Sequence, residues 1–549
     1  MTTHGTADLV LTGGRIFTAD AARSWAQALA VRGGRITAVG GDADVMRGAG
    51  PGTRVIDLGG RTVTPGFGDS HVHPISSGLD RLRCDLTGAA GIDDYLERVA
   101  TYAAANPDLP WILGGGWYLA HFPGGLASGE LLDRVVPDRP VFLPNRDGHD
   151  AWVNSRALEI AGITADTPDP HDGRIARNPD RSPLGTLHEG AQALIERHLP
   201  PTTDDELDRA LLESQAYFHS LGITNWQDAI VDAEGHATYL RVAGRGQLTG
   251  RVVGALWWEH DEGLEQVETL VARRAEGPVG RYAATSVKLM VDGIVENGTA
   301  AMVDPYLENG RETANRGMTF IEPAALRDIV VAIDALGFQA HFHALGDRAV
   351  RVALDAVEAA RSANGRTDTR PHLAHLQFIH PDDLPRFRRL GALANVQALW
   401  ALHEAQMDEL TLPLLTPDVA TRQYPLRSLR RHGATLVMGS DWAVSTCDPF
   451  AQMDIAVNRV IPGPEGAGHP PFMPAEAIEL TDALTAFTAG SAHASHLDAA
   501  GVIAVGRVAD LAVLDRDVFD RGAGGIADTR VVATFIDGVA VHETAALGG

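Results

Sequence analysis

Lysine is almost absent from this chain. Among 549 residues, the 46 lysines and arginines include a single lysine, Lys288. Arginine stays protonated in proteins, whereas a buried lysine can lose its proton and react as a neutral amine. Lys288 stands in an apolar run, 286–293, that is typical of a strand inside a sheet, where an unpaired ammonium is costly. We therefore interpret Lys288 as a residue that takes part in chemistry. The alternative is that an arginine-rich composition retained one lysine by chance.

Cysteines and long apolar runs are also scarce. The two cysteines, Cys84 and Cys447, are too few for a disulfide framework and exclude a cysteine-rich metal site. No apolar stretch approaches the roughly 20 residues of a membrane helix. Residues 1–10 lack the basic segment and apolar run of a signal peptide. We therefore expect a cytoplasmic protein that does not associate with membranes.

Positive charge is in deficit, with a formal net charge of −25 at pH 7. Such a charge disfavours nucleic acid and anionic membranes as partners. The partner that we expect is a small-molecule substrate, about which net charge says little because it is a property of the surface. A homodimer is one option for the assembly.

The two ends of the chain share one pattern. Residues 1–64 and 497–549 both contain short apolar strands, and Gly-Gly pairs that suit hairpins separate several of those in the first segment. A chain of this length exceeds one compact core. We therefore predict that 1–64 and 497–549 together form one small β-sandwich domain.

The middle of the chain, 65–496, alternates strands with helical stretches, which is the pattern of a parallel sheet. The candidate strands are 66–73, 223–229, 251–258, 286–291, 338–343, 372–377, 392–398 and 434–440. Eight strands with helical crossovers predict an α/β fold of the (β/α)8 TIM-barrel type, whose catalytic residues lie at the carboxyl ends of the strands. The segment of about 75–201 is too long for one crossover and is predicted to be a subdomain inserted after the first barrel strand.

Potential metal ligands occur on five of these strands, in or directly after them. Successive side chains of a strand alternate between its faces, so residues two apart can reach one metal ion. The first strand ends in such a pair, and the later strands add a lysine, two histidines and an aspartate. The set is His71, His73, Lys288, His343, His375 and Asp441.

The chemistry of this set is consistent with a hydrolytic metal centre. A neutral lysine amine can take up carbon dioxide, and the resulting carbamate on Lys288 would bridge two divalent ions. One ion would be held by His71, His73 and Asp441, and the other by His343 and His375. Imidazole and carboxylate ligands favour zinc, with manganese, iron or nickel as alternatives, in one or two copies. Asp441 would take a proton from the attacking water and pass it to a leaving nitrogen.

The chain resembles the amidohydrolase superfamily over essentially its whole length. The resemblance rests on 65–73, Lys288, His343, His375 and 439–441. More narrowly, 343–350, 439–442, 287–293, 145–149 and 154–158 resemble the branch that includes N-substituted formamide deformylase. The resemblance implies a metal-dependent (β/α)8 barrel with a β domain built from both ends. One departure is Ala374, where similar proteins often carry an acidic residue before the histidine; it bears on how His375 is oriented.

Four residues outside the ligand set are candidate substrate contacts. His149 of the insertion could hydrogen-bond a substrate carbonyl, or it could be a solvated loop histidine. Trp400 and Trp442 follow the last two barrel strands and could form an aromatic wall, or they could pack in the core. Asp292 ends the fourth strand and is a candidate for the rim of the site.

The function that we predict is metal-dependent hydrolysis of a carbon–nitrogen bond, an amide or formamide, in a small and partly apolar molecule. The first alternative is hydrolysis of another polarised centre on the same site: a cyclic amide, a carbamate, an ester or an aminated heterocycle. A non-catalytic relative is disfavoured because all six ligands are present. A lyase that forms a Schiff base on Lys288 would leave the histidines and Asp441 unexplained.

Overall fold

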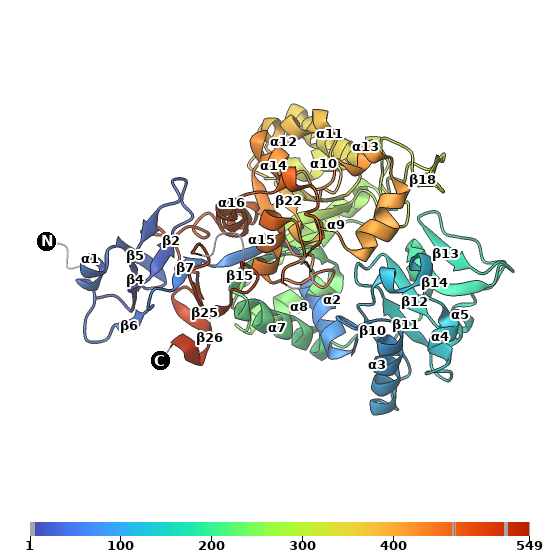
Figure 1. The fold of residues 1–549 in the computed structure, drawn as a ribbon, viewed down its shortest axis with the longest axis horizontal. Coiled ribbons are helices and arrows are strands. Elements are labelled where there is room, and N and C mark those ends of the chain that lie inside the picture. Colours follow the sequence, from blue (N-terminus) through green and yellow to red (C-terminus); the bar gives the residue numbers. More distant parts are fainter. Residues whose placement is uncertain (1–5, 464–465, 467, 521–524, 548–549) are drawn as a thin grey trace.

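The computed structural model describes residues 6–463, 466, 468–520 and 525–547. Figure 1 shows three regions along the long axis of the molecule. The strands of both chain ends lie at one end of the molecule, the insertion lies at the other, and the barrel with its helices lies between them. The insertion and the terminal strands therefore contact opposite sides of the barrel.

Eight parallel strands form the central sheet. Their order is β23-β22-β21-β20-β17-β16-β15-β8. They are β8 (Phe67–Val72), β15 (Ile223–Val231), β16 (Arg251–Trp257), β17 (Tyr282–Met290), β20 (Gln339–Ala344), β21 (His372–His375), β22 (Leu393–Val396) and β23 (Leu436–Met438). All eight coincide with strands predicted from the sequence, and the parallel order is the one that helical crossovers require.

The first and last strands nearly close this sheet into a barrel. No strand ladder joins β8 to β23 among the described residues, but two backbone hydrogen bonds join the chain just beyond them. The N–H of Asp441 donates to the carbonyl of His71 at 2.7 Å, and the N–H of His73 donates to the carbonyl of Trp442 at 3.1 Å. The sheet is thus a nearly closed eight-stranded parallel barrel, consistent with a TIM barrel, and its seam holds three of the predicted ligands.

Helices cover the outside of the barrel and provide its apolar contacts. They include α7 (Asp204–Ser220), α8 (Ala233–Gly244), α9 (Val267–Ala275), α10 (Pro323–Ala335), α11 (Asp347–Asn364), α12 (Leu384–Leu390), α14 (Leu426–Arg431) and α15 (Pro449–Asn458). Helix α7 begins at a capping box, in which the Thr203 and Glu206 side chains accept from each other's backbone N–H groups. No helix among the described residues is both long and apolar enough to cross a membrane.

Amides, rather than ionised groups, fill part of the barrel interior beneath the site. The Gln227 side chain donates to that of Gln339 at 3.0 Å, and the Asn395 side chain donates to the carbonyl of Ser70 at 2.9 Å. All four residues are buried. Buried polar groups are tolerated when they are hydrogen-bonded to one another, so this layer supports the site from below without adding charge.

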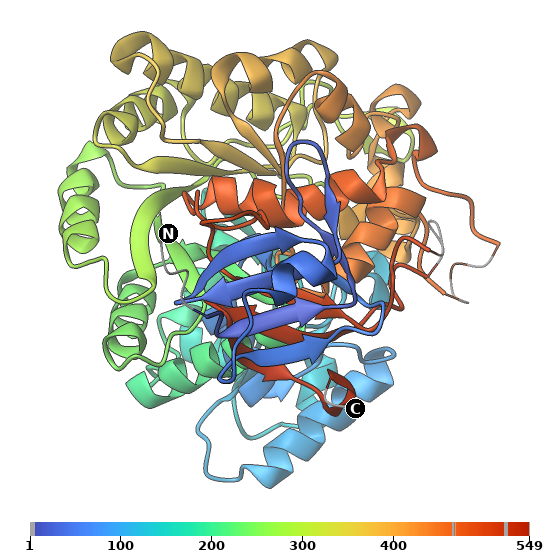
Figure 2. The same ribbon diagram turned by 90° about the vertical axis from the view of Figure 1, so that its left-hand side faces the viewer.

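The two chain ends form two sheets side by side (Figure 2). One has the order β5-β4-β1-β6 and the other the order β26-β25-β24-β7-β2-β3. Their strands are β1 (Leu9–Thr12), β2 (Arg15–Phe17), β3 (Trp25–Ala26), β4 (Ala28–Arg32), β5 (Arg35–Gly40), β6 (Arg54–Asp57), β7 (Thr62–Pro65), β24 (Leu511–Leu514), β25 (Val531–Ile536) and β26 (Val539–Glu543). One apolar cluster includes Leu11 and Leu29 from the first sheet with Val63 and Phe535 from the second. That these sheets constitute a β-sandwich domain stays a prediction, as do the domain boundaries.

The insertion after β8 has a sheet of its own, in the order β13-β14-β12-β11-β10-β9. Its strands are β9 (Cys84–Asp85), β10 (Ile112–Gly115), β11 (Val141–Pro144), β12 (Asp150–Val153), β13 (Gly173–Arg177) and β14 (Pro183–Glu189). Helices α3 (Ile92–Ala105), α4 (Gly129–Asp133) and α5 (Ser155–Ala161) accompany it. Trp117, Phe122 and Trp152 meet edge-to-face in its core. The same apolar cluster includes Val295 and Leu345 from the barrel region, so the insertion shares this interior with the barrel.

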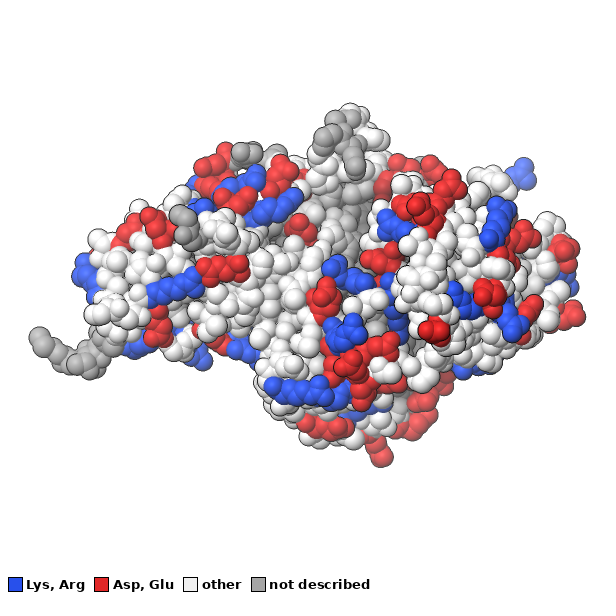
Figure 3. All heavy atoms as spheres, turned by 90° about the horizontal axis from the view of Figure 1, so that it is seen from below, with Lys and Arg blue, Asp and Glu red and all other residues white. Residues whose placement is uncertain are grey.

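Arg370 shows how arginine is used in paired geometries. The guanidinium of Arg370 donates twice to Asp368, at 2.9 Å each, and twice to Asp498, at 2.7 and 3.0 Å. Only the planar arginine fork can form such double contacts, so a lysine would not replace it equally. The face seen in Figure 3 shows basic and acidic side chains interspersed rather than gathered by sign.

One arginine ties the barrel to the terminal strands, and its removal is predicted to destabilise the protein. Arg251 at the start of β16 donates to Asp510 at 2.8 Å and to Asp537 at 2.5 Å. Asp510 is buried, so Arg251→Met leaves a buried carboxylate without its partner and should cost about 1–3 kcal/mol. Thermal unfolding should show a lower midpoint. Arg156→Met, which removes an exposed pair with Glu159, is the control and should leave the midpoint nearly unchanged.

Candidate metal centre

Three predicted ligands meet at the barrel seam. The Nε2 atom of His73 lies 2.9 Å from Oδ1 of Asp441, and Nε2 of His71 lies 3.3 Å from the same oxygen. The two histidines come from the end of β8, and Asp441 follows β23, so the backbone hydrogen bonds of the seam set these distances. Asp69 also links the two strand ends, because its Oδ1 accepts hydrogen bonds from the N–H groups of His71 and Ser440.

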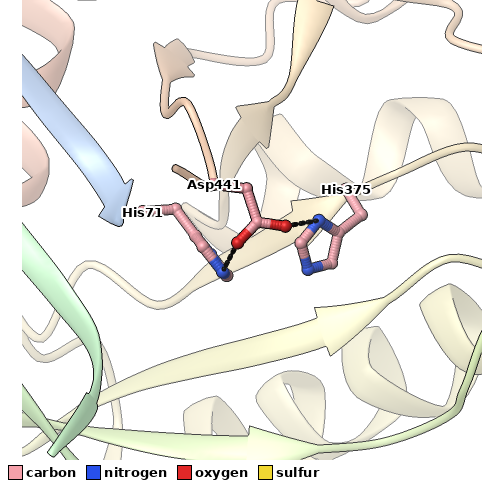
Figure 4. A group of neighbouring side chains, drawn as sticks. All are labelled: His71, His375 and Asp441. Carbon is pink, nitrogen blue, oxygen red and sulfur yellow. Dashed lines mark ion pairs between the residues drawn. The ribbon is translucent and has the colours of Figure 1, made fainter. Parts of the chain in front are cut away.

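His375 joins this group from the opposite oxygen of the same carboxylate. Its Nδ1 lies 3.8 Å from Oδ2 of Asp441, as Figure 4 shows. His71, His375 and Asp441 can place one ligand atom each within 4.8 Å of one another. This group combines members of both ligand sets that the sequence predicted. The assignment of each ligand to one ion stays a prediction.

The backbone at two of these residues is strained. His375 has a φ of +78° and Asp441 a φ of +55°, in the left-handed region that non-glycine residues rarely adopt. Both are held there by hydrogen bonds: the His375 N–H donates to the Gln397 side chain at 2.8 Å, and the Asp441 N–H donates to His71. Strain of this kind is found where a site requires a side chain in a particular position.

Lys288 lies at the bottom of the same site, on β17. Its side chain is buried, and Nζ lies 3.3 Å from Nε2 of His71. Burial lowers the pKa of Lys288 to about 8, although the Asp441 and Asp228 carboxylates oppose this shift. Burial increases the share of neutral amine, which is the form that reacts with carbon dioxide.

His343 completes the set from β20. Its ring lies 4.5 Å from that of His375, centroid to centroid, and its Nδ1 lies 3.4 Å from Oδ1 of Asp292. Asp292 is fully buried and accepts hydrogen bonds from the N–H groups of three residues in neighbouring loops: Ala301, Leu345 and Gly346. Because these bonds occupy the carboxylate away from the cavity, the structure corrects the predicted substrate contact of Asp292. It lies behind His343 instead and can orient its ring.

Unsatisfied ring nitrogens indicate that this site suits a metal ion. Both ring nitrogens of His375 and Nδ1 of His343 are buried without a hydrogen-bond partner. Burial lowers the pKa of both imidazoles well below the usual value, which keeps them neutral and able to ligate. Burial raises the pKa of Asp441, but the electrostatic interaction with His71 and hydrogen bonds from His71 and His73 outweigh it and hold the pKa well below its usual range. Neutral imidazoles around an ionised carboxylate are a donor set that a divalent ion fits.

A cavity of about 580 Å³ opens above these residues, between the strand ends and the insertion. His149 and Trp400, both predicted substrate contacts, line it. The Trp400 ring stacks on His375 with centroids 5.4 Å apart, and its buried Nε1–H has no hydrogen-bond partner. A substrate carbonyl near His375 could accept that N–H.

Trp442 does not line the cavity, which corrects the predicted aromatic wall. Its ring packs against Tyr217 and Phe218 of α7, with centroid distances of 5.5 and 5.3 Å. The apolar contact with the outer helix holds the ring outside the barrel, while the next residue, Ala443, lines the cavity. Sequence position alone could not distinguish these two directions.

Glu189 is a site residue that the sequence did not single out. Its Oε2 lies 2.7 Å from Nδ1 of His149, and Oε1 accepts from the hydroxyl of Thr299. Burial lowers the pKa of His149, but the Glu189 charge and hydrogen bond outweigh it and raise the pKa to about 9. The His149 ring, 5.6 Å from that of His343, therefore carries a proton toward the site. Glu189 lies 40 residues from His149 at the end of another strand, and no local motif marks it.

Comparison with known proteins places this site in a family. The model of the Amidohydrolase family matches residues 54–542. The protein LONG AFTER FAR-RED 3 of Arabidopsis thaliana is 31% identical, with 97% of this chain and 91% of that protein covered. N-substituted formamide deformylase of Arthrobacter pascens is 29% identical, with 98% of each covered. A solved structure of an uncharacterized metal-dependent hydrolase from Pyrococcus furiosus is 25% identical and superposes with a TM-score of 0.71, over 93% of this chain and 99% of that one.

The chain belongs to the amidohydrolase family, because the family match spans most of its length. The predicted resemblance to this family is confirmed. The fold, the histidine- and carboxylate-lined site and these relatives define a metal-dependent hydrolase of the amidohydrolase type.

Proposed function

We propose that this hydrolase cleaves a carbon–nitrogen bond, an amide or formamide, in a small and partly apolar molecule. The observation that carries the proposal is the buried contact of Lys288 with His71 beside Asp441, next to the His375 ring, both nitrogens of which have no hydrogen-bond partner. The similarity to N-substituted formamide deformylase supports the choice of bond.

Six residues would hold one or two divalent ions, for which we propose zinc: His71, His73, Lys288, His343, His375 and Asp441. Such ions supply Lewis acidity and lower the pKa of water that they bind. For Lys288 we propose a carbamate: the neutral Nζ forms a bond to the carbon of carbon dioxide and loses one proton. The buried side chain thereby changes from neutral to negative, which suits a ligand of cations.

Asp441 is proposed to move the proton of the reaction. Its carboxylate stays ionised, as its lowered pKa indicates, and it lies within reach of both seam histidines. An ionised carboxylate can accept a proton from the attacking water and then donate it to the leaving nitrogen. The backbone hydrogen bond from Asp441 to His71 keeps the carboxylate in place throughout.

His149 and Trp400 are proposed to position the substrate. The protonated His149 ring and the free Trp400 N–H are two donors on the cavity wall, each facing a histidine ligand. A substrate carbonyl between them would be oriented and polarised in the direction in which negative charge develops. The cavity also contains apolar residues such as Phe320, Ile294 and Met290, which can receive an apolar substituent.

Metal removal tests the chemistry. Protein as purified should contain divalent metal, and a strong chelator should remove both the metal and nearly all turnover; added zinc should restore turnover. Elemental analysis before and after chelation, together with a rate assay, measures this. Active, untreated protein without transition metal would contradict the proposal.

A substrate panel tests the bond. Metal-loaded protein should be assayed with N-substituted formamides, N-acyl amines, carbamates and lactones, with product amine, acid or formate as the readout. Turnover of formamides or N-acyl amines above the other classes is the expected result. Preference for lactones or carbamates would be consistent with the proposed metal-dependent hydrolysis but would contradict the proposal that an amide or formamide bond is cleaved.

A further inference from the structure

A second group of metal-ligating side chains lies at the rim of the cavity, apart from the central site. We refer to it as the rim cluster; its members are His171, Asp172, His260 and Asp261. The first two belong to the loop before β13 in the insertion, and the last two follow β16 of the barrel. Asp172 and His260 line the cavity. The cluster therefore joins the insertion to the barrel at the entrance to the site.

Three distances within the rim cluster are close to those between the ligand atoms of a metal ion. Nε2 of His260 lies 3.2 Å from Oδ2 of Asp172 and 3.6 Å from Oδ1 of Asp261. Nε2 of His171 lies 3.1 Å from the same Asp261 oxygen. At metal–ligand distances of roughly 2.0–2.2 Å, the ligand atoms of a tetrahedral site lie roughly 3.3–3.6 Å apart.

Nε2 of His171 pairs with Oδ1 of Asp261 in a hydrogen bond, whereas the His260 ring forms none with either aspartate. Nε2 of His260 is buried and has no hydrogen-bond partner, although two carboxylate oxygens lie within 3.6 Å. The Asp172 carboxylate lies so close to Gly190 that a Cβ atom at position 190 would be only 2.2 Å from it. A cation between the His260 nitrogen and the two carboxylates would satisfy all three groups at once.

We propose that the rim cluster binds one divalent transition-metal ion, with zinc as the best fit. Two imidazoles and two carboxylates suit zinc, cobalt or nickel, and their two negative charges balance the charge of the ion. A bound ion would tie the 164–172 loop of the insertion to the barrel and narrow the entrance to the cavity. This site is independent of the proposed reaction, because none of its members belongs to the central ligand set.

The test uses purified protein that retains its central ions. Binding of cobalt or zinc is measured by equilibrium dialysis for the wild type and for the variants His171→Gln and Asp261→Asn. The two variants alter exposed side chains, since His171 is 70% and Asp261 63% exposed. His198→Gln is the matched control, because His198 is an exposed histidine of the same insertion outside the cluster. The wild type and the control should bind one ion more than the two cluster variants at the same free metal concentration.

Hydrogen exchange gives a second readout that does not need activity. Added zinc should slow amide exchange in the 164–173 segment of the wild type and the control, and it should have no such effect in His171→Gln. Equal metal binding by all four proteins would overturn the proposal, as would a metal-soaked crystal without anomalous scattering at the rim cluster. Failure of the substrate panel would not affect either measurement, so the two proposals can fail separately.

Discussion

Asp441→Asn is expected to fold and bind metal but to lose most of its turnover, by about 10²–10⁴-fold. Asparagine keeps the size of the side chain and one oxygen near His73, but an amide cannot accept the proton of the attacking water. Steady-state rates on the best substrate from the panel, with elemental analysis of the same samples, measure this. The loss should appear in kcat rather than in KM, because the proton moves only in the chemical step.

Asp454→Asn is the matched control for the loss of a buried carboxylate. Asp454 is buried on α15, accepts hydrogen bonds from Asn458 and Ala527, and does not line the cavity. This variant should keep near-normal turnover even if its stability falls. Near-normal turnover of Asp441→Asn with metal bound would reduce Asp441 to a ligand and leave the proton transfer to another group.

Lys288→Arg is expected to lose bound metal and nearly all turnover. Arginine preserves the positive charge and is the basic residue at all other lysine or arginine positions of this chain. Arginine cannot form the carbamate. It would also place a permanent cation near Nε2 of His71, from which Nζ of Lys288 lies 3.3 Å. Metal content per chain, read by elemental analysis beside the rate, measures the effect.

Lys288→Ala separates the carbamate from other roles of the lysine. The variant leaves space where the carbamate would lie, and a short carboxylic acid in solution can supply the missing oxygens. Turnover and metal content should both recover in part with acetate or propionate, and neither should recover in Lys288→Arg, where the space is filled. A fully active Lys288→Arg protein would mean that the single lysine is an accident of composition.

Sequence periodicity predicted the barrel well, because each strand carries a local signature. Buried strands such as β17 and β20 are short apolar runs between helical stretches, and the positions of all eight strands agree with those predicted. The ligand set could be predicted for the same reason. In a parallel barrel all strands end at the same face, so polar residues at several strand ends are close in space whatever their separation in the chain.

The contacts of the second layer needed the tertiary structure. Asp292 looked like a rim residue, but three N–H groups from loops that follow β17 and β20 hold its carboxylate behind His343. Glu189 carried no signal, yet it sets the protonation of His149. These roles depend on how loops from distant strands approach each other, which no local pattern contains.

Local sequence patterns were sufficient to predict the family, the barrel and the central ligand candidates. Their physical basis is local: strand periodicity, the His71–His73 spacing and one retained lysine. Three features became visible only in the folded chain: His375 lies beside His71 and Asp441, Trp442 packs outward against α7, and the rim cluster forms between the insertion and the barrel. The direction of a side chain at a strand end is set by what packs against it, and those partners come from elsewhere in the chain.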